Sequence, residues 1–166
     1  MGLGLESNFF TPYCDAKDNT LRLLYYPPVQ KQLLDQPSQR RIGEHTDYGT
    51  ITLLFQDSVG GLQVKNHEGN YVQATPIEGT IVVNAADLLA RWSNDLIKST
   101  EHRVVSPPYD PLSDSYPARY SIAYFCHPNF AATIACLDGT WDDQKPKKYP
   151  PINSLEYLVQ RLSATY

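Results

Sequence analysis

The sequence predicts an all-β barrel or sandwich with helices confined to its edges. Short runs of aromatic and β-branched residues recur along the chain, and turn signals separate them. Pro27-Pro28 and the Gly-containing segments 59–61, 68–70 and 78–79 are such signals. The expected strands cover residues 21–26, 50–56, 61–64, 71–74, 80–84, 102–105 and 119–127.

The expected helices are few and peripheral. Near the end of the chain the spacing i, i+3, i+4, i+7 predicts one apolar helix face, with Asn153 or Ser154 as the N-cap. The residues of this face are Leu155, Leu158, Val159 and Leu162. Residues 87–92 are expected to form one short helical turn. The stretch 106–117 is rich in Pro, Ser and Asp, so we expect a mobile loop that acts as a lid.

Length and composition limit the classes of function. A chain of 166 residues with 42% hydrophobic and 19% charged residues fits one globular domain. The net charge of -4 and the absence of a basic block argue against a nucleic-acid partner, and no apolar run is long enough to span a membrane. Cys14, Cys126 and Cys136 cannot all pair, so we expect reduced thiols and a cytoplasmic location.

Three residues suggest a metal centre. His45 and Asp47 are two positions apart in a strand-like segment, which would direct both side chains to one face. His102 opens a second apolar strand. Two imidazoles and one carboxylate form the facial triad of iron(II) oxygenases. A structural histidine with a hydrogen-bond partner is the usual alternative for His45 or His102, and His67 in a turn-like segment is expected to be solvated.

The strand at 119–127 adds an anion-binding pattern. Strict alternation places five residues on one face: Arg119, Ser121, Ala123, Phe125 and His127. The planar guanidinium of Arg119 matches a carboxylate with two hydrogen bonds, and Ser121 can donate a third. The alternative is a surface arginine on an edge strand, but Ala123 and Phe125 on the same face favour an inward direction.

Five motifs of this sequence resemble one known family. The motifs are RLLYYPP, EHTDYGTITLLFQDSVGGLQV, NAADLLARWSND, KSTEHRVVSPP and PARYSIAYFCHPN. Together they make residues 3–166 similar to the isopenicillin N synthase-like iron(II), 2-oxoglutarate-dependent dioxygenases. The resemblance implies an all-β core in the form of a double-stranded β-helix, or jelly roll, with a C-terminal helix and few short peripheral helices.

The resemblance also implies roles for particular residues. His45, Asp47 and His102 would bind Fe(II), and Arg119, Ser121 and Tyr26 would bind the co-substrate 2-oxoglutarate. Phe125 and His127 fall where relatives contact the organic substrate. The implied reaction is oxidation of a small organic molecule with O2, by hydroxylation, desaturation or cyclisation, with release of succinate and CO2.

The chain departs from the family pattern in three places. Leu24 stands where the family often has Asn, and Ala86 stands where it usually has Gly, which is compatible only if the backbone there needs no positive φ. Asp87 is interpreted as structural. Residues 1–166 are expected to form a single domain without the family's N-terminal region, so apolar surface would be exposed to self-association or to a partner.

Other functions remain open at this point. Some family members use ascorbate or no 2-oxoacid, and a truncated, non-catalytic jelly roll that binds a partner is a further alternative. A zinc hydrolase fits less well, because a zinc site of two His and one carboxylate leaves Arg119 unexplained.

Overall fold

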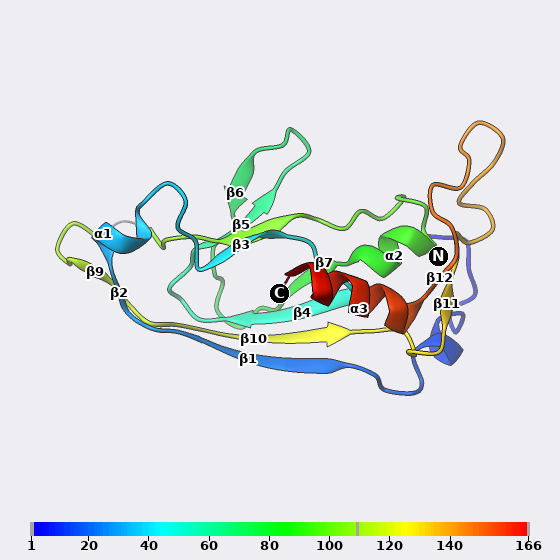
Figure 1. The fold of residues 1–166 in the computed structure, drawn as a ribbon, viewed down its shortest axis with the longest axis horizontal. Helices are drawn as coiled ribbons and strands as arrows, with labels where there is room; N and C mark the ends of the chain where they lie inside the picture. The colour runs from blue at the N-terminus through cyan, green and yellow to red at the C-terminus, as the bar shows by residue number, and fades with distance from the viewer. Residues whose placement is uncertain (1, 109, 166) are drawn as a thin grey trace.

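Two four-stranded antiparallel sheets form the body of the protein, which a computed structural model describes for residues 2–108 and 110–165 (Figure 1). The main sheet contains, in spatial order, β1 (Thr20–Tyr26), β10 (Arg119–Cys126), β4 (Ile51–Gln56) and β7 (Val82–Ala85). The minor sheet contains β3 (Ile42–His45), β8 (His102–Val104), β5 (Leu62–Lys65) and β6 (Tyr71–Gln73). Two facing sheets with this non-sequential order form a jelly roll, as the family resemblance implies.

Shorter elements close the ends of the two sheets. Two-residue strands pair as β2 (Val29–Gln30) with β9 (Ser115–Tyr116), and β11 (Thr133–Ile134) with β12 (Ile152–Asn153). The helices are the 3-10 helix η1 (Thr11–Tyr13), α1 (Lys31–Leu34), α2 (Asp87–Trp92) and α3 (Ser154–Thr165). In Figure 1, α1 with β2 and β9 lies at one end of the molecule, and β11 with β12 lies at the other. Among the described residues, none of the helices has the length and apolar character needed to cross a bilayer.

The alternation predicted for the strand at 119–127 is confirmed in β10. Arg119, Ser121 and Ala123 are buried, whereas Tyr120 and Ile122 between them are exposed. The side chains of Arg119 and Ser121 therefore face the space between the two sheets. The register pairs Tyr26 of β1 with Arg119, which brings these two residues to the same part of that space.

Each predicted strand is present, but several bounds differ. Thr80 lies outside β7, because its backbone N–H donates to the carbonyl of Ile77 in a turn (3.3 Å). His127 lies beyond the end of β10, and its N–H donates to Asn19 Oδ1 (3.0 Å). The expected loop 106–117 contains β9, and Tyr109 within it lies outside the described residues. Its mobility and its role as a lid stay predictions.

The predicted C-terminal helix is confirmed, and Asn153 is its N-cap. The Asn153 Oδ1 atom accepts the N–H of Glu156 (3.1 Å). The apolar face is largely open, with Leu155, Val159 and Leu162 exposed by 43%, 52% and 41%. The helix is instead attached through Tyr157, which packs against a buried cluster formed by Leu88, Trp92 and Ile134.

Candidate metal centre and co-substrate pocket

The structure brings His45, Asp47 and His102 together. Their ligand-type atoms all lie within 4.8 Å of one another, and Asp47 is buried. His45 is the last residue of β3 and His102 the first residue of β8, and the two are register partners. Asp47 lies in the connection between β3 and β4. The expectation that His45 and Asp47 share one strand is therefore wrong, since β3 ends at His45 and the chain crosses to the other sheet.

Both imidazole rings are held in the same tautomer. His45 Nδ1 contacts the carbonyl of Gly43 (2.8 Å), and His102 Nδ1 contacts the carbonyl of Thr100 (3.0 Å). Because a carbonyl only accepts, each Nδ1 carries the hydrogen, and each Nε2 offers its lone pair to a metal. The Nε2 atoms of His45 and His102 lie 3.9 and 3.7 Å from Asp47 Oδ1.

Burial keeps His45 in the form that binds metals. Burial, and then the neighbouring His102, hold the pKa of His45 below its ordinary value. The neutral imidazole is thereby favoured, and only the neutral ring can act as a metal ligand.

The carboxylate of Asp47 is oriented by two neutral donors. Thr52 Oγ1 and Asn84 Nδ2 both donate to Asp47 Oδ2, at 2.7 and 2.9 Å. The backbone carbonyl of Asp47 accepts the N–H of Asp87 (2.9 Å) at the start of α2. Oδ1 is thus left to face the two imidazoles. A donor set of two neutral histidines and one fixed carboxylate fits iron(II).

Thr52 and Asn84 were not singled out from the sequence. They are register partners on β4 and β7, and both line the space between the sheets. The available signal was a polar side chain on the inner face of an alternating strand. That signal is weak until the register is known.

Asp87 is structural, as interpreted from the sequence. Its Oδ2 accepts the hydroxyls of Thr46 (3.2 Å) and Tyr157 (2.8 Å) and pairs with Arg161 (3.2 Å). Asp87 therefore joins α3 to the segment that carries the candidate ligands His45 and Asp47. Ala86 before it has a φ of -118°, so the residue that replaces the family's Gly occupies a backbone conformation open to any residue.

A cavity of about 370 Å³ extends from the candidate metal centre between the two sheets. Its walls include seven of the eight predicted site residues: His45, Asp47, His102, Arg119, Ser121, Tyr26 and Phe125. Leu24 lines the same cavity with other apolar side chains, so the substitution of the family's Asn makes this wall less polar. His127 is buried but is not part of the described wall. Its contact with substrate stays a prediction.

Arg119 is fully enclosed inside the cavity wall. Its side chain is 1% exposed, so the alternative of a surface arginine is wrong. Nε donates to the carbonyl of Gly60 (3.0 Å), and the terminal nitrogens contact Ser121 Oγ and Gln56 Oε1, each at 3.4 Å. These partners are neutral, and a buried guanidinium is strongly stabilised by a carboxylate.

A second guanidinium, that of Arg41, adds positive charge next to Arg119. Arg41 lies 5.8 Å from the ring of Tyr26, and Arg119 lies 5.2 Å from the same ring. Burial, and then the charge of Arg119, lower the pKa of Arg41. Within the described part of the chain, Arg41 Nε and Nη1 are buried without a hydrogen-bond partner. This arrangement favours an anionic ligand next to Tyr26 and Arg119.

Comparison with known proteins identifies the family. The sequence profile of the 2OG-Fe(II) oxygenase superfamily matches residues 17–128. The 2-oxoglutarate-Fe(II) type oxidoreductase ppzD of Metarhizium majus is 39% identical, over 100% of this chain and 48% of that protein. Proline hydroxylase buaE of Petromyces alliaceus is 38% identical, over 98% of this chain and 51% of that protein.

Solved structures show the same fold. A full-length Neurospora crassa protein in complex with alpha-KG is 58% identical with a TM-score of 0.91, over 99% of this chain and 50% of that one. The rice dioxygenase for auxin oxidation is 28% identical with a TM-score of 0.79, over 98% of this chain and 51% of that one. The chain thus spans about half the length of the relatives it matches. It belongs to the 2OG-Fe(II) oxygenase superfamily.

Proposed function

We propose that this chain forms the centre of an iron(II)- and 2-oxoglutarate-dependent oxygenase that oxidises a small organic molecule and releases succinate and CO2. One observation carries the proposal: a His-Asp-His cluster opens into the same cavity as a buried arginine whose protein partners are neutral. A metal centre alone does not require such an arginine. A metal centre whose co-substrate is a dicarboxylate does, because the second carboxylate of that co-substrate needs a cation to pair with.

Two sets of residues in the pocket would bind two different ligands. His45, Asp47 and His102 would hold Fe(II), and Arg119, Ser121 and Tyr26 would hold the distal carboxylate of 2-oxoglutarate. Iron(II), when bound with 2-oxoglutarate and O2, supplies the oxidising chemistry. The chain's own part is to fix geometry: the apolar wall excludes water, and Thr52 and Asn84 keep Asp47 in place.

Anaerobic titration tests the metal and the co-substrate together. Iron(II) added with 2-oxoglutarate should give a visible charge-transfer absorption, and under O2 the chain should form succinate. Replacing His45, Asp47 or His102 with Ala should abolish both signals, with His67→Ala in the exposed turn at 66–69 as the matched control. Oxidation that persists after loss of a proposed ligand contradicts the assignment.

We further propose a pyrimidine base as the organic substrate. The Neurospora crassa protein, 58% identical over this chain, has been solved in complex with alpha-KG and thymine and with alpha-KG and 5-formyluracil. The cavity of about 370 Å³ has room for a single-ring molecule beside the co-substrate, and Phe125 in its wall can stack on a flat ring. Phe125 and His127 are the proposed substrate contacts.

Comparing thymine with free proline tests the proposed substrate class. Thymine should increase 2-oxoglutarate consumption and be oxidised in step with succinate formation. Free proline is the matched comparison, since the proline hydroxylase buaE is 38% identical. Coupled oxidation of proline but not of thymine would overturn the pyrimidine proposal and leave the oxygenase proposal intact.

Two alternatives give different outcomes in the same assays. A family member that uses ascorbate or no 2-oxoacid should bind iron but form no succinate from 2-oxoglutarate. A non-catalytic jelly roll that binds a partner should take up neither ligand, and the exposed apolar side chains of the main sheet, such as Leu23 and Val83, are the observation that favours this case.

We also propose a cytoplasmic location. Cys14, Cys126 and Cys136 are all free thiols in the structure, which suits a reducing compartment. Cell fractionation tests this: recovery with a secreted or membrane fraction would contradict it.

A further inference from the structure

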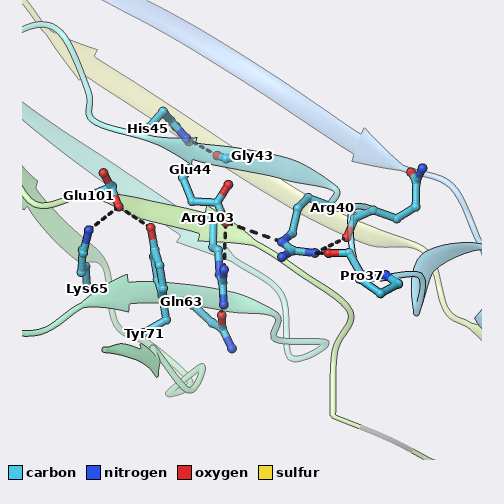
Figure 2. A network of polar contacts seen from close by, with 11 residues as sticks. Pro37, Arg40, Gly43, Glu44, His45, Gln63, Lys65, Tyr71, Glu101 and Arg103 are labelled. Carbon is cyan, nitrogen blue, oxygen red and sulfur yellow. Dashed lines mark hydrogen bonds and ion pairs between the residues drawn. The ribbon is translucent and has the colours of Figure 1, made fainter. Parts of the chain in front are cut away.

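A polar network that includes Arg103 and Glu101, the two residues on either side of His102 in the chain, lies on the outer face of the minor sheet (Figure 2). Successive residues of a strand point to opposite faces, so Arg103 and Glu101 point away from the cavity that His102 lines. Lys65 and Tyr71 both bind Glu101, the former at 3.0 Å. The residues of this network are Glu44, Gln63, Lys65, Tyr71, Glu101 and Arg103.

A β-bulge in β3 determines where His45 points. The register pairs Ile42 with Val104 and His45 with His102, so β3 advances three residues while β8 advances two. Gly43 and Glu44 consequently lie opposite Arg103 alone. Ile42 and His45 are three residues apart and would face opposite ways in a regular strand, yet both line the cavity. The extra residue therefore turns His45 into the metal centre.

The Arg103 side chain connects this bulge to other strands of the minor sheet. Its Nη1 donates to Glu44 Oε1 (2.8 Å) and its Nε to Gln63 Oε1 (2.8 Å). Its guanidinium carbon also lies 3.8 Å from the ring centre of Tyr71. One side chain thus connects the bulge of β3 with β5 and β6, and its own backbone lies in β8 between β3 and β5.

We propose that Arg103 is a positioning residue for the metal centre: it holds the β3 bulge through Glu44 and thereby holds His45 opposite His102. The inference rests on the proposed function, because it assumes that His45 binds the metal. Arg103 acts on His45 through the backbone of Gly43 and Glu44, and the Gly43 carbonyl is the group that fixes the His45 ring.

The alternative is an ordinary surface ion pair. The side chains of Arg103 and Glu44 are 20% and 41% exposed, and exposed pairs contribute little to stability. A surface pair of this kind would leave metal affinity unchanged. A positioning role would change metal affinity more than it changes the stability of the metal-free chain.

Cobalt(II) is a suitable probe because its visible spectrum reports ligand geometry directly. Arg103→Met should weaken Co(II) binding by about tenfold, at the lower end of the loss caused by removing residues that orient metal ligands, and should alter the spectrum of the bound ion. The thermal midpoint of the metal-free variant should stay close to that of the original chain. Arg103→Lys should restore part of the affinity, since Lys can pair with Glu44 but cannot also reach Gln63.

Arg40→Met is the matched control. Arg40 Nε lies 3.6 Å from the same Glu44 oxygen, but its hydrogen bonds go to the nearby carbonyls of Pro37 and Gln39. This variant removes the same charge next to Glu44 without removing a bridge between strands, so its Co(II) affinity should remain within about twofold of the original, a shift well below the loss expected from Arg103→Met.

The outcomes separate the two proposals. Unchanged Co(II) affinity in Arg103→Met, or equal weakening in Arg40→Met, overturns the positioning role and leaves the metal centre intact. If Arg103→Met does not fold, Glu44→Gln decides, because it weakens the same bridge from the other side: several-fold weaker Co(II) binding supports the role and unchanged binding overturns it. Failure of the original chain to bind Co(II) or Fe(II) overturns the proposed metal centre, and this inference with it.

Discussion

At the scale of single residues, the proposed metal centre depends on side chains other than its three proposed ligands. Asp47 can offer Oδ1 to an ion because Thr52 and Asn84 occupy Oδ2. His45 and His102 can offer Nε2 because backbone carbonyls accept from Nδ1. The geometry of the ligands is thus set by neutral hydrogen bonds, which orient the carboxylate without neutralising its charge.

Removing one of these hydrogen bonds should weaken the metal centre. Thr52→Val deletes the 2.7 Å bond to Asp47, and we expect iron(II) affinity to fall by about tenfold, since Asn84 alone no longer fixes the carboxylate. Anaerobic isothermal titration calorimetry measures this iron(II) affinity. Thr50→Val is the matched control, because Thr50 Oγ1 donates to the carbonyl of Cys126 (3.0 Å) instead. Equal loss in both variants would argue against the role of Thr52.

A second change at this scale separates co-substrate binding from metal binding. Arg119→Lys keeps the positive charge but loses the two-pronged geometry, so the apparent affinity for 2-oxoglutarate should fall by about tenfold, the equivalent of one charge-assisted hydrogen bond. Iron(II) affinity in the absence of 2-oxoglutarate should not change. The charge-transfer absorption measures the first quantity and anaerobic calorimetry the second, and an unchanged 2-oxoglutarate affinity would contradict the role of Arg119.

At the scale of elements, α3 is attached to the site by a polar contact rather than by its apolar face. Tyr157 donates to Asp87, which also accepts from Thr46 between the proposed metal ligands His45 and Asp47. Burial, and then the hydrogen bond to Asp87, raise the pKa of Tyr157 to about 12. The protonated phenol is therefore favoured in the folded chain.

This contact predicts an alkaline transition. A folded-state pKa that is raised from 10 to about 12 stabilises the protein below pH 10, and this contribution is lost as the pH rises towards 12. Tyr157→Phe should reduce the decline in unfolding free energy over that window. Denaturant unfolding at successive pH values measures it, with Tyr120→Phe on the exposed face of β10 as the control. An identical decline in Tyr157→Phe would show that the contact does not couple to folding.

At the scale of the whole molecule, the outer face of the main sheet is a broad apolar surface. Strand register places Leu23, Ile122 and Phe55 next to one another on this face, and they are 72%, 41% and 42% exposed. Leu21, Tyr25, Val83 and Tyr120 extend the same surface. An apolar face of this size is typical of an interaction site. The proposed self-association or partner binding would use it.

The exposed sheet face predicts concentration-dependent association. Leu23→Lys combined with Ile122→Lys should lower the average mass measured by analytical ultracentrifugation, because the two charges would be desolvated at an interface. Leu112→Lys is the control, since Leu112 is 94% exposed and lies outside the sheet, in the 106–117 segment. A monomeric chain at all concentrations would contradict self-association through this face.

Much of the site was predictable because its residues lie on strongly patterned strands. In β10 the period of two determines that Arg119 and Ser121 share a face, and the buried positions confirm it. The Asn153 cap and the helix after it likewise follow from local chemistry. Two-residue strands such as β2 and β9 were not predictable, because two residues cannot show a period.

Chemical type and order along the chain are enough to propose metal-binding and anion-binding residues, namely His45, Asp47, His102, Arg119 and Ser121. How these residues come together depends on the tertiary fold. The crossing of the chain between sheets after His45 places Asp47 opposite both imidazoles, and the bulge in β3, which Arg103 contacts through Glu44, gives His45 its direction. Both depend on strand register, which is set by contacts between residues far apart in the sequence and is therefore not visible in any one segment.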